Sequence, residues 1–247
     1  MHHPTPALTI LGAGYVGEAL LRRFPAADAT HQTPHSDPRR HLFRLDDAST
    51  WQNPPVAERI VIWTFPAQPL EHVKAFYDSC LKEAAGLIVL GSTSAYALPP
   101  EETQPVTTVD EDTPLDMTRP RVQGEEWLRT QGATTLQLAG IFGPNRDPAG
   151  WLLRNRIKDG AKIVNLIHVD DIVALIAHLV DHPQPGKRLN VANGEPVVWR
   201  DLVARFQEEG RVPADLTLPE STSGKHGKCV DTNRLQSLLQ HHRFLRP

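Results

Sequence analysis

Residues 7–24, ALTILGAGYVGEALLRRF, decide the fold of this chain. Five mostly apolar residues come first and stop at Gly12, which is typical of a short buried strand. Val16, Ala19 and Leu20 then recur at helical spacing. The segment therefore predicts a strand, a glycine turn and a helix.

The turn itself matches the pattern G-x-G-x-x-G through Gly12, Gly14 and Gly17, with Tyr15 and Val16 at the variable positions. Between a strand and a helix, this pattern is typical of dinucleotide binding. The first glycine permits a tight turn, the second lets the backbone approach a pyrophosphate, and the third lets the helix pack close to the strand. The N–H groups at the helix start would hold the phosphates. The alternative is a glycine-rich turn that binds no ligand.

Farther along the chain, apolar runs alternate with amphipathic stretches. Further strands are expected at about 26–30, 42–45, 59–65, 87–90, 134–138, 189–191 and in a run that ends at 168–169, and further helices at about 70–85, 118–130, 170–179, 199–209 and 231–240. Thr118 is expected to cap its helix, and 97–117 and 143–150 are expected to be loops. Alternation of this kind predicts an α/β fold, a doubly wound parallel sheet with helices on both faces.

Composition excludes several classes of protein. The chain has 247 residues, of which 40% are hydrophobic and 22% charged, with a net charge of −3 and two cysteines. These values fit a globular protein and argue against a disulfide framework and against nucleic-acid binding. We see no signal peptide and no apolar run long enough for a membrane span, so we expect a cytoplasmic protein without membrane partners.

The choice between NAD and NADP is usually made at the end of the second strand, where an acid binds the ribose 2′-hydroxyl of NAD. Residues 30–33 read Thr-His-Gln-Thr and contain no acid, so His31 stands at this position. Arg39 and Arg40 follow in the same loop and favour NADP, with NAD as the alternative. Asp46, after the third strand, is placed to meet an adenine amino group. Solvated loop charges and a turn aspartate are the structural alternatives.

Several segments together resemble the extended short-chain dehydrogenase/reductase superfamily, the NAD(P)-dependent epimerases and dehydratases. They occur in the order that the superfamily shows, and they cover roughly residues 8–195. The segments are the glycine turn, Gly91-Ser-Thr-Ser-Ala-Tyr96, Asp110-Glu-Asp-Thr-Pro-Leu115, Leu138-Ala-Gly-Ile-Phe-Gly-Pro144, His168-Val-Asp-Asp171 and Leu189-Asn-Val191.

The resemblance implies a Rossmann-like domain at 1–192 and a small C-terminal substrate lobe at 193–247, to which 143–162 contribute. It also implies site residues. Ser92 would polarise a substrate carbonyl, and Arg146 in the loop after residue 143 would hold a substrate phosphate or carboxylate. A serine that bonds local backbone groups in a turn and a solvated loop arginine are the structural alternatives. Cofactor contacts are expected from three residues at the end of the strand at 59–65, namely Thr64, Phe65 and Pro66.

One departure from the superfamily concerns its Tyr-x-x-x-Lys dyad, in which the tyrosine is the acid/base. The alignment places Met117 at the tyrosine position and Arg121 at the lysine position. A thioether transfers no proton, whereas Arg121 retains a charge that could contact the cofactor. Tyr96 is the remaining candidate proton donor, and a packed aromatic is its structural alternative.

We therefore expect an atypical, NAD(P)-binding epimerase- or dehydratase-like oxidoreductase that acts on a small polar carbonyl or sugar-derived substrate. A non-catalytic NADP sensor is the alternative, because the dyad is absent. We expect no metal, since the pair His168 and Asp170 lacks a third ligand at suitable spacing. Pairing of flanking helices into a homodimer stays open.

Overall fold

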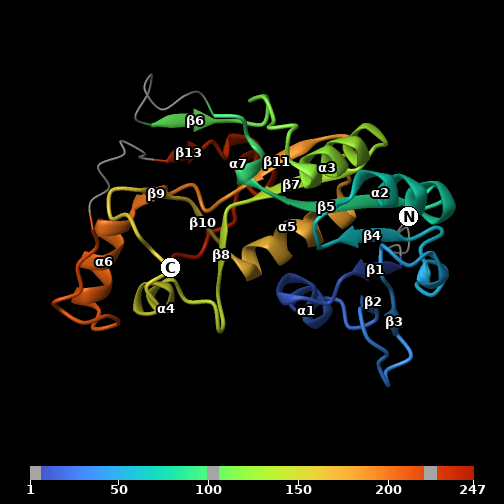
Figure 1. The fold of residues 1–247 in the computed structure, drawn as a ribbon, viewed down its shortest axis with the longest axis horizontal. Coiled ribbons are helices and arrows are strands. Elements are labelled where there is room, and N and C mark those ends of the chain that lie inside the picture. Colours follow the sequence, from blue (N-terminus) through green and yellow to red (C-terminus); the bar gives the residue numbers. More distant parts are fainter. Residues whose placement is uncertain (1–6, 99–105, 220–226) are drawn as a thin grey trace. The chain divides into compact units, whose positions relative to one another are not determined.

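The computed structural model describes residues 7–98, 106–219 and 227–247. Its central sheet has seven strands in the order β11-β7-β5-β4-β1-β2-β3 (Figure 1). β1 pairs in parallel with β2 and β4, β2 with β3, and β4 with β5. The strands are β1 Leu8–Leu11, β2 Asp28–His31, β3 Arg40–Leu42, β4 Ile60–Trp63, β5 Gly86–Ser92, β7 Thr134–Leu138 and β11 Arg188–Val191. The Rossmann-like α/β fold expected from the sequence is confirmed.

Helices lie on both faces of this sheet, α2 and α3 on one and α1 and α5 on the other (Figure 1). Their bounds are α1 Tyr15–Arg23, α2 Leu70–Phe76, α3 Pro120–Thr130 and α5 Val169–Asp181. Two acidic residues stand in the first turn of α5, as expected, and favour its positive end. None of the helices among the described residues has the length and apolar character needed to cross a bilayer.

Outside the central sheet, the described residues form three two-stranded sheets. β8 pairs in parallel with β10, β6 in parallel with β13, and β9 antiparallel with β12. Their bounds, with the remaining helices, are β6 Thr107–Val109, β8 Gly140–Phe142, β9 Ile163–Val164, β10 Leu166–His168, β12 Val197–Val198, β13 Lys228–Val230, α4 Pro148–Leu153, α6 Trp199–Glu208 and α7 Asn233–Leu238.

Backbone contacts divide the chain into two compact units. The first unit comprises 1–95, 115–137 and 172–189, and the second comprises 96–114, 138–171 and 190–247. The chain thus passes repeatedly between the units. The sequence analysis expects a different division, into a domain at 1–192 and a lobe at 193–247, and this domain boundary stays a prediction.

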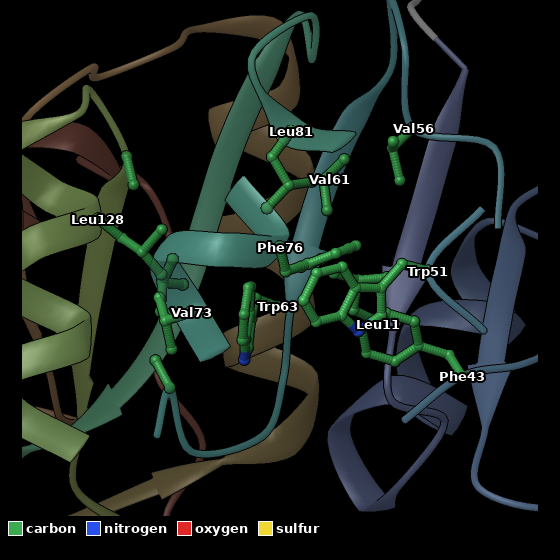
Figure 2. Close-up of a cluster of buried hydrophobic side chains, with 13 residues drawn as sticks. Leu11, Phe43, Trp51, Val56, Val61, Trp63, Val73, Phe76, Leu81 and Leu128 are labelled. Atoms are coloured by element: carbon green, nitrogen blue, oxygen red, sulfur yellow. The ribbon is translucent and has the colours of Figure 1, made fainter. Parts of the chain in front are cut away.

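The core of the first unit is a cluster of aromatic and aliphatic side chains (Figure 2). Phe76 is fully buried and lies 4.9 Å from Phe43, 5.6 Å from Trp51 and 5.9 Å from Trp63, measured between ring centroids. Such tilted contacts suit the quadrupoles of aromatic rings. The cluster anchors α2 against the sheet and so holds the strand ends in place. The second unit has its own apolar cluster around Trp199 and Phe206.

Three local expectations were wrong. Where one helix was expected at 70–85, the α-helical part covers Leu70–Phe76, and a π-helical turn, Tyr77–Leu81, follows it directly. Thr118 does not cap α3, because its hydroxyl donates to Asp116 instead, and the helix begins one residue after Arg119. The expected loops contain β6 and α4, whose short runs carry little periodicity; residues 99–105 of the first loop lie outside the described residues.

Candidate functional site

The glycine turn joins β1 to α1 at the carboxyl edge of the sheet. Gly12 has a φ of 97°, and its N–H donates to the Thr30 hydroxyl at 2.8 Å. A Cβ at Gly12 would lie 2.7 Å from Thr64 Oγ1, so a side chain there would collide with the end of β4. At Gly14, by contrast, no atom lies within 4 Å of the Cβ position. The backbone at Gly14 is therefore open to an incoming group.

A cleft of ≈ 670 Å³ opens at this turn. It lies in the first unit, and residues that follow β1, β2, β3 and β4 line it. Its lining residues are Gly12, Ala13, Gly14, Thr30, His31, Gln32, Phe43, Arg44, Leu45, Asp46, Phe65, Gln68, Pro69 and His72. Ligands of open α/β sheets bind at this edge. The volume and the open glycine backbone suit a dinucleotide.

Five of the expected cofactor contacts line the cleft, and six do not. Gly12, Gly14, His31, Asp46 and Phe65 line it. Tyr15, Val16 and Gly17 do not line it, because they lie in α1. The Thr64 hydroxyl donates to the Gly12 carbonyl instead. Pro66, which is exposed, and Arg39 do not line the cleft either. The α1 and β4 residues thus shape the turn that the cleft borders.

Arg44 is the arginine that lines the cleft, and the sequence analysis overlooked it. Arg39 instead donates to the Pro25 carbonyl and lies beside Asp37, while Arg40 forms an ion pair with Glu18. Register explains the difference. Arg40 begins β3, whereas residue 44 follows the end of that strand, where side chains border the carboxyl edge.

His31 carries a perturbed imidazole at the same place. Its partial burial lowers its pKa, and the neighbouring charge of Arg40 lowers it further. Its ring stacks on that of His35 at 5.1 Å between centroids. His31 therefore favours its neutral form beside the cleft.

A second polar group forms where β5 ends. Arg121 donates from Nη2 to Ser94 Oγ at 2.8 Å, and the hydroxyl oxygens of Ser94 and Ser92 lie 3.1 Å apart. Because Ser94 accepts from Arg121, its own proton is free for Ser92 Oγ. The Ser92 proton is then free for a ligand oxygen. Ser92 and Arg121, both expected at the site, are thus joined through Ser94, while Met117 stands on the surface with 47% of its area exposed.

Glu125 completes this group, and the sequence analysis missed it. Arg121 donates from Nη1 to Glu125 Oε1 at 3.0 Å, and the Glu125 side chain is only 2% exposed. Burial raises the pKa of Glu125 to about 7, although Arg121 acts in the opposite direction. A buried glutamate one helical turn after a basic residue is the signal that could have drawn attention to it.

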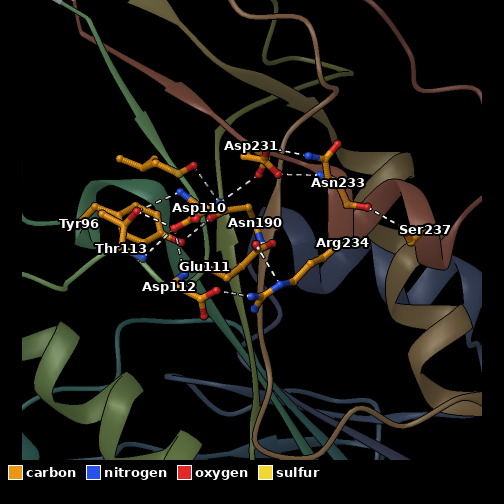
Figure 3. A network of polar contacts seen from close by, with 11 residues as sticks. Tyr96, Asp110, Glu111, Asp112, Thr113, Asn190, Asp231, Asn233, Arg234 and Ser237 are labelled. Carbon is orange, nitrogen blue, oxygen red and sulfur yellow. Dashed lines mark hydrogen bonds and ion pairs between the residues drawn. The ribbon is translucent and has the colours of Figure 1, made fainter.

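Tyr96 belongs to a buried network of the second unit (Figure 3). Its ring is 3% exposed, and its hydroxyl donates to Asn190 Oδ1. The Asn190 amide N–H groups are directed to the Asp231 and Val109 carbonyls, which leaves Oδ1 as the acceptor. The Asn190 backbone N–H donates to Glu111 at 2.9 Å. This geometry favours the packing interpretation of Tyr96 over the proton-donor interpretation, with the hydroxyl bonded in the interior.

An open, basic cavity of ≈ 560 Å³ lies in the second unit. Three arginines, an indole and an amide line it, with no acidic residue among them. Its lining residues are Asn145, Arg146, Trp151, Arg154, Arg156 and Ile157. A cavity of this charge attracts anions, although the whole chain carries a net charge of −3. Among the described residues, no three His, Cys, Asp or Glu side chains gather as metal ligands would.

Solved chains of short-chain dehydrogenases/reductases and of epimerases share this fold over more than nine tenths of their length. The chain therefore has the fold of the superfamily that its motifs resemble, and that expectation is confirmed.

Three proteins illustrate what this chain is similar to. Protein YeeZ of Escherichia coli, from strain K12 and from O157:H7, is 31% identical over 177 residues, which span 67% of this chain and 61% of YeeZ. A short-chain dehydrogenase/reductase superfamily protein from Agrobacterium tumefaciens, solved with bound NAD, is 15% identical with a TM-score of 0.75, covering 97% of this chain and 93% of its own. RMD from Pseudomonas aeruginosa, complexed with NADPH, is 15% identical with a TM-score of 0.72, covering 98% and 95%. No family model matches the chain.

Proposed function

We propose that this protein binds a nicotinamide dinucleotide in the cleft at the glycine turn and uses it as an oxidoreductase or epimerase-like enzyme. The observation that carries the proposal is the coincidence of the open Gly14 backbone with a cleft at the carboxyl ends of β1 to β4. The start of α1 would hold the pyrophosphate, and Asp46 would accept from the adenine amino group. The fold neighbours described above with NAD and with NADPH support this class of cofactor.

Within that class we propose NADP(H) as the preferred cofactor. Residues 30–33, where NAD enzymes carry the acid that binds the ribose hydroxyl, contain no acid, and Arg44 is among the residues that line the cleft. A guanidinium there would pair with the 2′-phosphate. This proposal moves the specificity-determining role from Arg39 to Arg44.

Calorimetry with NAD⁺, NADH, NADP⁺ and NADPH tests both statements. We expect tighter binding of the phosphorylated pair, and Arg44→Ala should weaken it by about tenfold, the equivalent of one charge-assisted contact. Arg39→Ala is the matched control and should leave the affinity unchanged. If all four dinucleotides fail to bind at millimolar concentration, the proposed function is wrong.

For the reaction, we propose that Ser92 donates to a substrate carbonyl while Arg121, through Ser94, orients it. The nicotinamide would supply the hydride chemistry. Separately, we propose that the cavity of the second unit binds a phosphate or carboxylate group, because Arg146, Arg154 and Arg156 line it without an acidic residue. A screen of cofactor oxidation against phosphorylated and carboxylated aldehydes, ketones and sugars tests the proposed reaction. Turnover that survives Ser92→Ala unchanged would refute the role of Ser92.

Two observations favour a second candidate, a non-catalytic NADP sensor. The dyad tyrosine is replaced by Met117, and the Tyr96 hydroxyl is bonded in the interior. Tight NADP(H) binding without turnover in the whole screen would favour the sensor.

A further inference from the structure

The wall between α3, β5 and β7 holds an unusual pair of side chains. Glu125 on α3 and Gln137 on β7 are 2% and 1% exposed. Both approach Gly91 of β5, where a Cβ would lie 2.5 Å from Glu125 Oε2 and 2.8 Å from Gln137 Oε1. Only a residue without a side chain leaves room for them. Gly91 thus creates a small polar compartment in the interior.

Two oxygens in this compartment lack a hydrogen-bond donor. Among the described residues, neither Glu125 Oε2 nor Gln137 Oε1 has a hydrogen-bond partner as the side chains lie. When Glu125 is ionised, both oxygens are hydrogen-bond acceptors without a proton, so neither can donate a hydrogen bond to the other. A proton on Oε2 turns the acid into a donor and gives each atom a partner. Leaving a buried polar atom without a hydrogen bond costs more free energy of folding than a typical hydrogen bond contributes. Protonation of Glu125 is therefore favourable here.

We propose that Glu125 is a neutral acid that donates from Oε2 to Gln137 and acts as a positioning residue for Arg121. Its Oε1 still accepts from Arg121 Nη1, which directs Nη2 to Ser94. Because Glu125 is uncharged, it does not neutralise the charge of Arg121. That charge is available to an anionic or electron-rich ligand beside Ser92.

The charged groups around Glu125 are few. Arg121 faces it from its own helix, and Arg188 acts on it from β11. Both favour ionisation, as does hydrogen bonding with Gln137, whereas burial opposes it and raises the pKa of Glu125 to about 7. Gln137 on β7 and Gly91 on β5 add no charge. The acid should therefore be protonated below neutral pH and lose its proton above it.

The alternative arrangement has the Gln137 amide rotated, so that its NH₂ group donates to an ionised Glu125. The two arrangements predict opposite effects of Gln137→Leu. Removal of an acceptor from the neutral acid destabilises that form and lowers the midpoint, whereas removal of a donor from the carboxylate raises it. This variant keeps Glu125 itself in place.

The direct test is a ¹³C NMR titration of protein labelled at the glutamate carboxyl carbons. We expect one carboxyl with a midpoint near 7. The signal of this carboxyl should disappear in Glu125→Gln and persist in Glu126→Gln, the matched control on the same helix. The midpoint of its titration should fall in Gln137→Leu. A midpoint in the ordinary range of glutamate, or a rise in Gln137→Leu, would overturn the neutral acid. This test needs no cofactor and does not depend on the proposed function.

The ligand part of the inference rests on the proposed function and on a contact between Arg121 and the cofactor, which its place at the dyad lysine position implies. NADPH affinity, measured at pH 6 and 8, should fall with pH about 3- to 10-fold more in the wild type than in Glu125→Gln, since one nearby charge is neutralised. Histidines at the cleft contribute equally to the pH dependence of both proteins, so the comparison removes their effect. Identical pH profiles would overturn the positioning role. If NADPH binds neither protein, the proposed function fails, and the NMR titration still decides the state of Glu125.

Discussion

Gly17 and Gly14 belong to one turn but meet different surroundings. A Cβ at Gly17 would lie 2.2 Å from the carbonyl oxygen of Gly12, a backbone atom that cannot move aside. Gly14 has open space and a φ of −81°, which any residue adopts. The two glycines therefore serve different purposes, one for packing and one for access.

We expect Gly17→Ala to lower the free energy of unfolding by about 1–3 kcal/mol, the usual cost of overpacking. Gly14→Ala should change it by less than about 0.5 kcal/mol, as at other uncrowded positions, and should instead weaken dinucleotide binding. Urea unfolding and calorimetry of both variants check this. Equal stabilities of the two variants would contradict the packing role of Gly17.

Met117 and Arg121, which the sequence resemblance places at the dyad positions, differ in a similar way. Met117 is 47% exposed, so Met117→Tyr should leave the melting temperature nearly unchanged. Arg121 contacts both Ser94 and Glu125, and a lysine cannot donate to both in the geometry of a guanidinium. We expect Arg121→Lys to cost about 1 kcal/mol, the value of one hydrogen bond. Thermal melting of the two single variants tests it, and a larger loss in Met117→Tyr would show that residue 117 is packed.

At the scale of elements, α3 is tied to β11 by one carboxylate. Glu126 accepts from Arg129 at 2.6 Å and from Arg188 at 2.7 Å, and Arg129 also donates to the Gly186 carbonyl. Burial would raise the pKa of Glu126, but the bonds from the two arginines hold it below its ordinary value. A depressed pKa in the folded protein means that this stabilisation is complete above the pKa of the unfolded chain. It is lost as the pH falls through the folded pKa.

Glu126→Gln should therefore lower the free energy of unfolding by about 1–2 kcal/mol at neutral pH, as for bonds to charged groups that are partly screened. The difference from the wild type should vanish in acid, once the pH lies below the ordinary range of glutamate. Chemical unfolding of both proteins between pH 3 and 8 measures it. A difference that persists unchanged in acid would show that the carboxylate charge is not responsible.

At the scale of the whole molecule, the proposed cofactor site collects segments that are distant in sequence. The cleft is lined from the glycine turn, from 30–32, from 43–46 and from the segment after β4. A ligand that binds only the folded protein stabilises all of these segments together. We expect saturating NADPH to slow amide exchange in 12–17, 30–32 and 43–46 at once. Protection confined to 12–17 would indicate a phosphate site without a dinucleotide site.

Local pattern alone determined much of this protein. The sequence pattern predicted all seven strands of the central sheet within a few residues. The signal is clearest in β1 and β4, because a strand buried on both faces is largely apolar. The glycine pattern at Gly12–Gly17 likewise predicted the turn at the edge of the cleft. Both depend on neighbours in the sequence, so the sequence carries them directly.

Only the tertiary structure decided which side chains meet. The sequence pattern placed Arg39 in a loop and Arg44 within a strand at 42–45, yet β3 ends at Leu42, so Arg44 follows the strand and lines the cleft. Glu125 looks like an ordinary helix residue until Gly91 and Gln137, from two other strands, enclose it. Burial and partners across the sheet determine charge and orientation, and those contacts join residues far apart in the chain. No local pattern records them, so only the folded chain reveals them.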